Sequence, residues 1–355
     1  MEKIILQEDI LKNFDPNATG IKGHLFGLPF TPETSSIVVI PVPWEVTVSY
    51  HSGAVNGPSA ILDASTQVDL FVKDIPDAWK AGISMLPVPE SLVKESSKLR
   101  ELAAQHIARY ENHGALPPTD PILSKINEAC ENLNIYVKST VKKLLREGKM
   151  VALLGGDHST PLGFIRALSE QYDRFGILQI DAHADLRKSY QGFLYSHASI
   201  MFNALKLPSV NRLVQIGIRD FCDEEMQVIE RARGRILTFF DEDIKAEIYK
   251  GRTWDAICEK IIAALPENVY ISFDIDGLDP RLCPGTGTPV AGGFEFNEIT
   301  YLVRKLVRSG KKIIGFDLNE VAPSQHSDWD ANVGARMLYQ LCNLMAVSKG
   351  KLKLS

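Results

Sequence analysis

Residues 175–185 read FGILQIDAHAD, an apolar run that ends in two aspartates and a histidine. The run from Phe175 to Ile180 has the composition of a strand buried on both faces, as in a parallel sheet. Asp181 and His183 are two residues apart, so a strand would point them to the same side. Carboxylates at the end of a buried strand are costly to desolvate unless a partner compensates them. The stretch therefore predicts a parallel α/β sheet with a charged site at a strand end.

Two other segments repeat this arrangement. Residues 155–159 (GGDHS) follow the apolar run 151–154, and residues 274–277 (DIDG) follow the run 269–273. Because open parallel sheets place their sites at the carboxyl ends of the strands, we expect these segments to meet. Two divalent cations would compensate the charge, and the predicted ligands are His158, Asp181, His183, Asp185, Asp274 and Asp276.

An oxygen-rich ligand set without thiolates suits two Mn²⁺ ions, although Ni²⁺, Co²⁺ or Zn²⁺ could bind. Asp157 is a fifth carboxylate nearby, and it could instead cap the helix that follows. Asp279 is followed by Pro280, a pair more typical of a turn than of a ligand.

The composition narrows the class of protein. The chain has 355 residues, 45% of them hydrophobic, and a net charge of −5, so neither disorder nor nucleic-acid binding is expected. No apolar run approaches the length of a membrane span, and the N-terminus lacks the apolar core of a signal peptide. The five scattered cysteines form no CxxC pair, which favours reduced thiols and a cytoplasmic location. Cys283 follows the third acidic segment and is expected to be a buried apolar residue.

Strand-like and helix-like patterns alternate along the chain. This alternation predicts one domain over residues 1–355, with a three-layer α-β-α fold around a central, mostly parallel sheet. An N-terminal extension covers about residues 1–35, and a polar helical insertion covers about residues 87–121, with a helix over 94–110. Strands are expected at 37–42, 151–154, 175–180, 213–218, 236–239, 269–273 and 313–317. Helices are expected at 124–147, 161–172, 223–232, 255–264, 296–308 and 333–347. Residues 53–58 are expected to form a loop.

The motifs resemble those of the ureohydrolases, the family of arginase, agmatinase and formimidoylglutamase. The resemblance covers most of the chain from about Pro41, and agmatinase-like members are the most similar. It is carried by GGDH at 155–158, DAHAD at 181–185, a histidine at 197, SFDIDGLDP at 272–280, PGTGTP at 284–289 and EVAP at 320–323. It implies an arginase-like fold and a binuclear metal centre that hydrolyses a guanidino group and releases urea.

The resemblance also implies residue roles. One metal would be held by His158, Asp181, Asp185 and Asp274, and the other by Asp181, His183, Asp274 and Asp276. His197 matches the histidine that exchanges protons with solvent, Asp185 would carry a proton, and Glu320 matches the carboxylate that holds the guanidinium. The family also implies a homo-oligomer, a trimer or a hexamer.

The loop DLRKSYQG at 185–192 resembles agmatinase loops, so a small cationic guanidino substrate is expected, first of all agmatine. Arg187 has two interpretations: it could bind an anionic substrate end, or pair with an acidic residue of the protein. Ala322 and residues 326–330 depart from the family pattern, and Trp44, Tyr50 and Trp329 could narrow the pocket for guanidine itself. Guanidine, guanidinobutyrate or another guanidino acid, arginine and formimidoylglutamate therefore stay open, and so does an inactive metal-binding paralogue.

Overall fold

The computed structural model describes residues 9–324 and 326–355, so the first eight residues of the predicted N-terminal extension lie outside the described part. An eight-stranded sheet forms the centre, and its strand order is β2-β1-β3-β8-β7-β4-β5-β6. Every neighbouring pair is parallel. The strands are β1 (Ile37–Val42), β2 (Ile83–Met85), β3 (Met150–Gly155), β4 (Phe175–Ile180), β5 (Val210–Ile218), β6 (Ile236–Phe240), β7 (Asn268–Asp274) and β8 (Lys312–Asn319).

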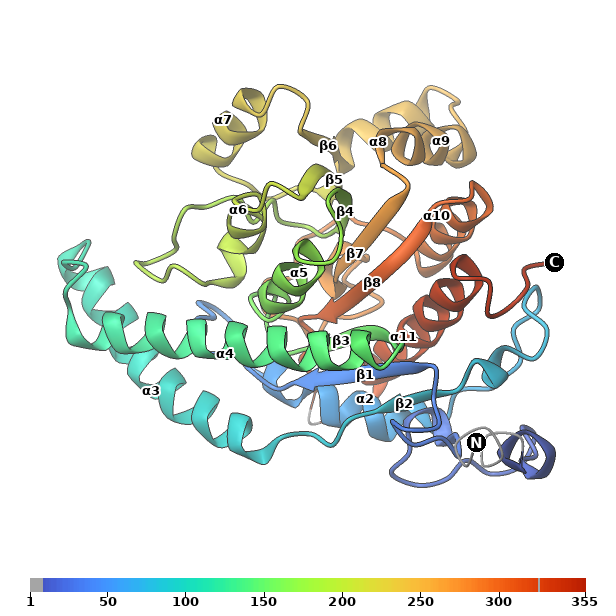
Figure 1. Ribbon diagram of the computed structural model, residues 1–355. Coiled ribbons are helices and arrows are strands. Elements are labelled where there is room, and N and C mark those ends of the chain that lie inside the picture. Colours follow the sequence, from blue (N-terminus) through green and yellow to red (C-terminus); the bar gives the residue numbers. More distant parts are fainter. Residues whose placement is uncertain (1–8, 325) are drawn as a thin grey trace.

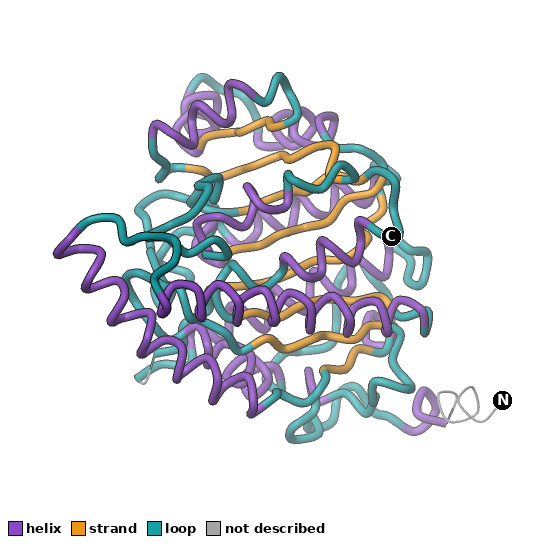
Figure 2. The backbone as a smooth tube through the Cα atoms, turned by 60° about the vertical axis from the view of Figure 1, so that its left-hand side comes forward, coloured by secondary structure: helices purple, strands orange, loops and turns teal. Residues whose placement is uncertain are grey.

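Helices pack on both faces of the sheet and form the outer layers of an α-β-α fold (Figures 1 and 2). One apolar core contains residues from α2 (Gly57–Ser65), α9 (Trp254–Ala264), α10 (Phe296–Arg308) and α11 (Trp329–Ser348). The other contains residues from α3 (Glu90–His113), α4 (Pro121–Arg146), α5 (Leu162–Ser169) and α6 (Ile200–Ala204). Because successive strand residues point to opposite faces, Val39 belongs to the first core and its neighbours Val38 and Ile40 to the second.

The predicted element bounds agree with the structure wherever the apolar pattern is strong. β1, β4 and α10 have the expected residues, and the other predicted strands and helices differ at their ends. Residues 53–58 were expected as a loop, but α2 begins at Gly57, with Pro58 in its first turn, where a missing N–H costs nothing. The expected insertion contains α3, which is longer than the predicted helix, and α3 packs along α4 (Figure 1).

Four central strands, β3, β8, β7 and β4, are neighbours in this order. Three of them, β3, β4 and β7, lead into the segments that carry the predicted ligands, and the fourth, β8, leads into Glu320. The topology thus gathers residues that are far apart in the chain at one edge of the sheet. Among the described residues, no helix is long and apolar enough to cross a membrane.

Candidate metal centre

The six predicted ligands lie together at the carboxyl ends of β3, β4 and β7. The Nδ1 atom of His158 lies 3.0 Å from Oδ2 of Asp181, 3.1 Å from Oδ2 of Asp185 and 3.4 Å from Oδ2 of Asp274. All four side chains are buried. One ring nitrogen therefore faces three carboxylates.

A second group shares Asp181 with the first. The Nδ1 atom of His183 lies 3.1 Å from Oδ2 of Asp276 and 3.6 Å from Oδ1 of Asp181. In each of the groups His158–Asp181–Asp185 and Asp181–His183–Asp276, the possible ligand atoms lie within 4.8 Å of one another. Two adjacent clusters with a common carboxylate are a suitable arrangement for two neighbouring cations.

The pKa shifts at this edge show that a cation would stabilise the ionised carboxylates. Burial, together with the charge of Asp181, raises the pKa of Asp185 to about 7. Burial and the neighbouring Asp276 and Asp181 raise the pKa of Asp274 well above its usual range. Burial opposes protonation of His158, yet the surrounding carboxylates raise its pKa well above the ordinary value.

Within the described residues, Nδ1 of His158 has no hydrogen-bond partner, although it is buried. The raised pKa of His158 shows that these three carboxylates favour a positive charge at Nδ1, which a bound divalent cation would supply in place of the proton. The donor set of imidazole nitrogens and carboxylate oxygens therefore fits divalent cations.

A row of polar side chains, buried except for the half-buried Thr238, crosses the sheet two residues before the ligand positions of β4 and β7. The members are paired across adjacent strands: Thr238 on β6, Gln215 on β5, Gln179 on β4, Ser272 on β7 and Asp317 on β8. Nε2 of Gln179 donates to Oδ2 of Asp181 at 2.8 Å, and Nε2 of Gln215 donates to Oε1 of Gln179 at 2.6 Å. The row is completed by Thr238 Oγ1, which donates to Oε1 of Gln215 at 2.8 Å.

The same row supports His158 from the other side. Oγ of Ser272 lies 2.9 Å from Nε2 of His158 and donates to Oδ1 of Asp317 at 3.1 Å. Because this hydroxyl donates to Asp317, it accepts from His158, so Nε2 carries the proton and Nδ1 is free to bind a metal. The sequence interpretation missed Gln179, Gln215 and Asp317, whose polar side chains at the ends of buried strands were the available signal.

Glu320 contacts the first cluster through the backbone of His158. Its Oε1 accepts the backbone N–H of His158 at 2.8 Å, while its buried Oε2 has no hydrogen-bond partner among the described residues. Burial and the charge of Asp157 raise its pKa well above the usual range. Gly287 faces this free oxygen, since a Cβ atom built there would lie 3.1 Å from Oε2. A side chain at Gly287 would therefore crowd the unsatisfied carboxylate.

Helix α11 forms a hydrogen bond to the segment 284–289. Oδ1 of Asp330 accepts the N–H of Gly285 at 2.8 Å, and the carbonyl of Gly285 accepts the N–H of Ala322 at 2.8 Å. The departure at Ala322 is therefore compatible with the local backbone contacts.

His197 lines the entrance to the cluster together with His183 and Asp185. The cavity has a volume of about 130 Å³, and its other lining residues include Ser49, Arg187, Tyr190, Asp220, Phe221, Glu225 and Thr288. Burial lowers the pKa of His197 to about 3, so its ring is neutral at pH 7. The ring of Tyr190 meets it edge to face, with centroids 6.0 Å apart.

The contacts of Arg187 decide between its two interpretations, a ligand for an anionic substrate end or a partner of an acidic residue of the protein. Its Nε lies 3.7 Å from Oε2 of the buried Glu225, and its guanidinium lies over the ring of Tyr190 at 5.1 Å. Glu225 also accepts the N–H of Leu186 at 3.0 Å, which fastens the chain just after Asp185. Arg187 is thus paired with an acidic residue of the protein. Asp220 is the more exposed carboxylate here, with 67% of its side chain accessible, and its Oδ2 lies 3.8 Å from Nε2 of His183.

Other residues singled out in the sequence lie elsewhere. Trp44 belongs to the second apolar core, and neither it, nor Tyr50, nor Trp329 lines the cavity. Asp157 does not join the ligand clusters, because its Oδ1 accepts the N–H of Ser159 at 2.9 Å and turns the chain there. Cys283 is a buried free thiol, as expected, and burial raises its pKa.

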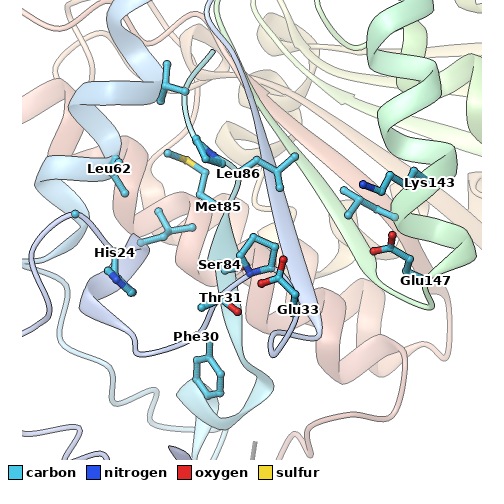
Figure 3. A pocket seen from close by; sticks show the side chains of 16 residues that line it. His24, Phe30, Thr31, Glu33, Leu62, Ser84, Met85, Leu86, Lys143 and Glu147 are labelled. Atoms are coloured by element: carbon cyan, nitrogen blue, oxygen red, sulfur yellow. The ribbon is translucent and has the colours of Figure 1, made fainter. Parts of the chain in front are cut away.

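A larger cavity, of about 680 Å³, lies away from the ligand clusters (Figure 3). It is lined by residues before β1, by the segment around Met85 and by the end of α4, where Lys143 and Glu147 are labelled. These segments include the chain that enters β1 and β3, so the cavity reaches toward the amino ends of the strands. None of the predicted site residues lines it.

A parallel sheet with paired histidine–carboxylate clusters at its carboxyl edge is the arrangement of a metal-dependent hydrolase. The model of the arginase family matches residues 35–343, and the chain belongs to this family. Its members hydrolyse guanidino C–N bonds and release urea, so this protein is a ureohydrolase.

Individual relatives refine the comparison. The N(1)-aminopropylagmatine ureohydrolase of Thermus thermophilus is 33% identical, with 92% of this chain and 96% of that one covered. The agmatinase of Halalkalibacterium halodurans is 28% identical over 82% of this chain and 86% of its own.

Among solved structures, the agmatine ureohydrolase of Thermoplasma volcanium has a TM-score of 0.70 and 24% identity, and the match covers 97% and 99% of the two chains. The arginase of Bacillus cereus has a TM-score of 0.62 and 23% identity, with 86% and 98% covered. These structural matches confirm the fold.

Proposed function

We propose that this ureohydrolase acts on agmatine and yields putrescine and urea. The observation that carries the proposal is the buried Oε2 of Glu320, which lies beside the candidate ligands and has no hydrogen-bond partner in the part of the chain that the structure describes. A planar guanidinium offers parallel N–H groups to such a carboxylate, and the bond is strengthened by the charges of both partners. Glu320 would thus hold the guanidino carbon next to the ligand atoms of His158 and Asp274.

The metal centre in this proposal holds two Mn²⁺ ions, with Ni²⁺, Co²⁺ and Zn²⁺ as alternatives. His158, Asp181, Asp185 and Asp274 would hold one ion, and Asp181, His183, Asp274 and Asp276 the other. Divalent cations at such a centre activate water and stabilise the negative charge that develops during its attack.

The protein's own groups would orient the substrate and move protons. Glu320 would align the guanidinium, and Asp185 would carry a proton during the reaction. His197, neutral at pH 7 and placed at the cavity entrance, exchanges a proton between the leaving amine and solvent. The intact positions of His197 and Glu320 argue against an inactive paralogue, which needs neither group.

The entrance favours a substrate with a cationic tail. Arg187 is paired with Glu225, so it offers little to a substrate carboxylate, while Asp220 leaves an accessible negative charge. This supports agmatine over arginine, guanidinobutyrate and formimidoylglutamate. N1-aminopropylagmatine, which has a longer cationic tail, is the second candidate, because the relative with 33% identity over 92% of this chain bears that name.

Urea release from a panel of substrates tests the proposal. The enzyme would be loaded with Mn²⁺ or with Ni²⁺ and given agmatine, N1-aminopropylagmatine, guanidinobutyrate, arginine and guanidine, with Asp276→Ala as the inactive control. We expect the highest kcat/KM with agmatine. A higher value with N1-aminopropylagmatine would favour the second candidate, and the absence of urea from all five would overturn the proposal.

The homo-oligomer, as a trimer or hexamer, the cytoplasmic location and the single domain over residues 1–355 stay predictions. Sedimentation velocity of the metal-loaded protein would measure the number of subunits.

A further inference from the structure

The insertion that contains α3 touches two loops that line the active-site cavity. The first wall loop, residues 43–53, follows β1 and contributes Ser49 to the cavity. The second wall loop, residues 186–196, follows the ligand segment of β4 and contributes Arg187 and Tyr190. His197 comes directly after the second wall loop. Figure 1 shows α3 and α4 side by side along one edge of the molecule.

The second wall loop contains a tight turn at residues 190–193, and α3 forms a hydrogen bond to this turn. Tyr190 and Phe193 exchange both backbone hydrogen bonds, at 3.1 and 2.9 Å, and the turn residues Gln191 and Gly192 have φ of 51° and 89°. Two positive φ values in a two-residue turn are typical of a type I′ hairpin. Nε2 of His106, from α3, lies 2.8 Å from the carbonyl oxygen of Gln191. A carbonyl only accepts, so the imidazole Nε2–H donates this bond.

His106 is a fully buried side chain, and its ring lies 5.0 Å from that of Phe193. A buried histidine with an N–H aimed at a loop carbonyl fixes that loop, because breaking the bond would strand two polar groups away from water. The loop is thus tied to α3 across 85 residues of sequence.

Helix α4 holds the same turn from a second direction. Oδ1 of Asn127 accepts the N–H of Leu194 at 2.8 Å, and its Nδ2 lies 3.5 Å from the carbonyl of Gly192. A Cβ at Gly192 would lie 3.1 Å from the side chain of Leu123, so the turn lies close against α4. The hairpin of α3 and α4 is itself locked by Asp120, which accepts the N–H groups of Ile122 and Leu123 and pairs with Arg109 at 2.8 Å.

The first wall loop is bonded to the same helix, nearly three turns before His106. Oγ of Ser96 accepts the N–H of Glu45 at 3.0 Å, and Oε2 of Glu45 accepts the N–H groups of Gly53 and Val55 at 2.7 and 2.9 Å. Ser96 is fully buried. Ser96 and His106 are ten residues apart, which is about 15 Å along a helix.

We propose that α3 is a specificity element of the active site. By holding one wall loop through Ser96 and the other through His106, it fixes the width of the entrance through which the substrate tail passes. His106 is a positioning residue for Tyr190 and His197. The anchoring follows from the contacts alone, whereas its effect on a guanidino substrate rests on the proposed function.

Three variants test this role. His106→Ala removes the bond to Gln191, His106→Gln retains an N–H donor on a flexible chain, and His113→Ala changes an exposed histidine near the end of the same helix. We expect His106→Ala to speed hydrogen exchange at the amides of residues 187–197 about tenfold, the size typical of one buried hydrogen bond. It should raise KM for agmatine about tenfold, with two metal ions still bound. His106→Gln should restore part of both effects, and His113→Ala should change neither.

Unchanged exchange and unchanged KM in a folded His106→Ala protein would overturn the proposal. If that variant does not fold, Ser96→Ala provides the test from the same helix, because it removes the bond to Glu45, and hydrogen exchange is then measured at residues 43–53. If the wild-type protein releases no urea, the proposed function fails, while the exchange measurement still decides whether α3 holds the loop.

Discussion

Glu320 adopts a left-handed backbone with φ of 66°, a conformation that is strained for a non-glycine residue. Six non-glycine residues of the described chain have a positive φ, and Asp185, Gln191 and Glu320 among them belong to the site or its second wall loop. Such strain persists where surrounding contacts hold it in place, and it gathers at functional sites. At Glu320 the bond from the N–H of His158 provides one of those contacts.

Glu320→Gln keeps the shape of this side chain and removes its charge. The bond to His158 can persist, but a neutral amide loses the charge-assisted contact to the guanidinium. A hydrogen bond to a charged group contributes about 2 kcal/mol, so we expect kcat/KM to fall about 30-fold. Steady-state urea release would measure the effect, and metal content should stay at two ions. A variant with wild-type kcat/KM would remove Glu320 from substrate binding.

His197 makes stability depend on pH. Burial lowers its pKa from the ordinary 6.5 to about 3, so between these values the unfolded chain binds a proton that the folded chain does not. The contribution of this residue to the free energy of unfolding is therefore complete above pH 6.5 and decreases as the pH falls toward 3. Urea unfolding at pH 7.5 and pH 5 should show a smaller loss for His197→Asn than for the wild type. An equal loss in both proteins would contradict the buried, neutral state.

At the scale of elements, the polar row joins five neighbouring strands into a support for the ligands. Gln179 and Gln215 were expected only as interior residues of strands, because a single sequence does not give the register that pairs them. The observed register places Gln215 beside Gln179, and Gln179 bonds to the carboxylate that both metal clusters share. Such outer contacts commonly change metal affinity 10–100-fold.

Gln179→Leu tests this support. The substitution removes the donor to Asp181 and leaves Oδ2 of that buried carboxylate with fewer partners. We expect metal affinity, measured by calorimetric titration of Mn²⁺ into the metal-free protein, to fall about tenfold or more. Thr238→Val, at the far end of the row on β6, is the matched control and should have a smaller effect. Equal affinities for the wild type and Gln179→Leu would show that Asp181 is oriented without the row.

The strand and helices that the sequence did not predict are short, from three residues in β2 to nine in α2 and α8. β2 has three residues, and α8 (Asp241–Tyr249) begins directly after β6 with no turn residue between them. A hydrophobic period can be recognised only over a longer stretch of sequence. The glycine or proline that usually separates two elements is also missing at Phe240 and Asp241. The contact of His106 with Gln191 lies beyond any local pattern, because the two residues are 85 positions apart.

For the whole molecule, the sequence predicted which candidate ligands lie together, but not what surrounds them. The candidate ligands followed from apolar runs that end in acidic residues, since topology alone brings the carboxyl ends of β3, β7 and β4 to one edge. The wall loops, the pairing of Arg187 with Glu225 and the role of α3 depend on tertiary packing. A single sequence contains no signal for such contacts.

The buried carboxylates at this edge of the sheet are candidate metal ligands, but they lower the stability of the metal-free protein. In the metal-free protein, Asp274 has a raised pKa because it is buried beside Asp276 and Asp181, so its ionisation opposes folding at neutral pH. Cations remove this penalty, and one ion at 100 times its Kd adds about 2.7 kcal/mol to the free energy of unfolding. A chelator should therefore lower Tm, and Mn²⁺ should restore it.

Asp274→Asn separates the two contributions. Without metal, the variant lacks the carboxyl group whose ionisation opposes folding, so we expect its Tm to exceed that of the wild type. With Mn²⁺ the order should reverse, because the variant has lost a ligand that the wild type can use. Thermal unfolding of both proteins, with chelator and with Mn²⁺, would measure the four values. If the wild type has the higher Tm in both conditions, repulsion among these carboxylates is not what destabilises the metal-free protein, and the cations are not needed to offset it.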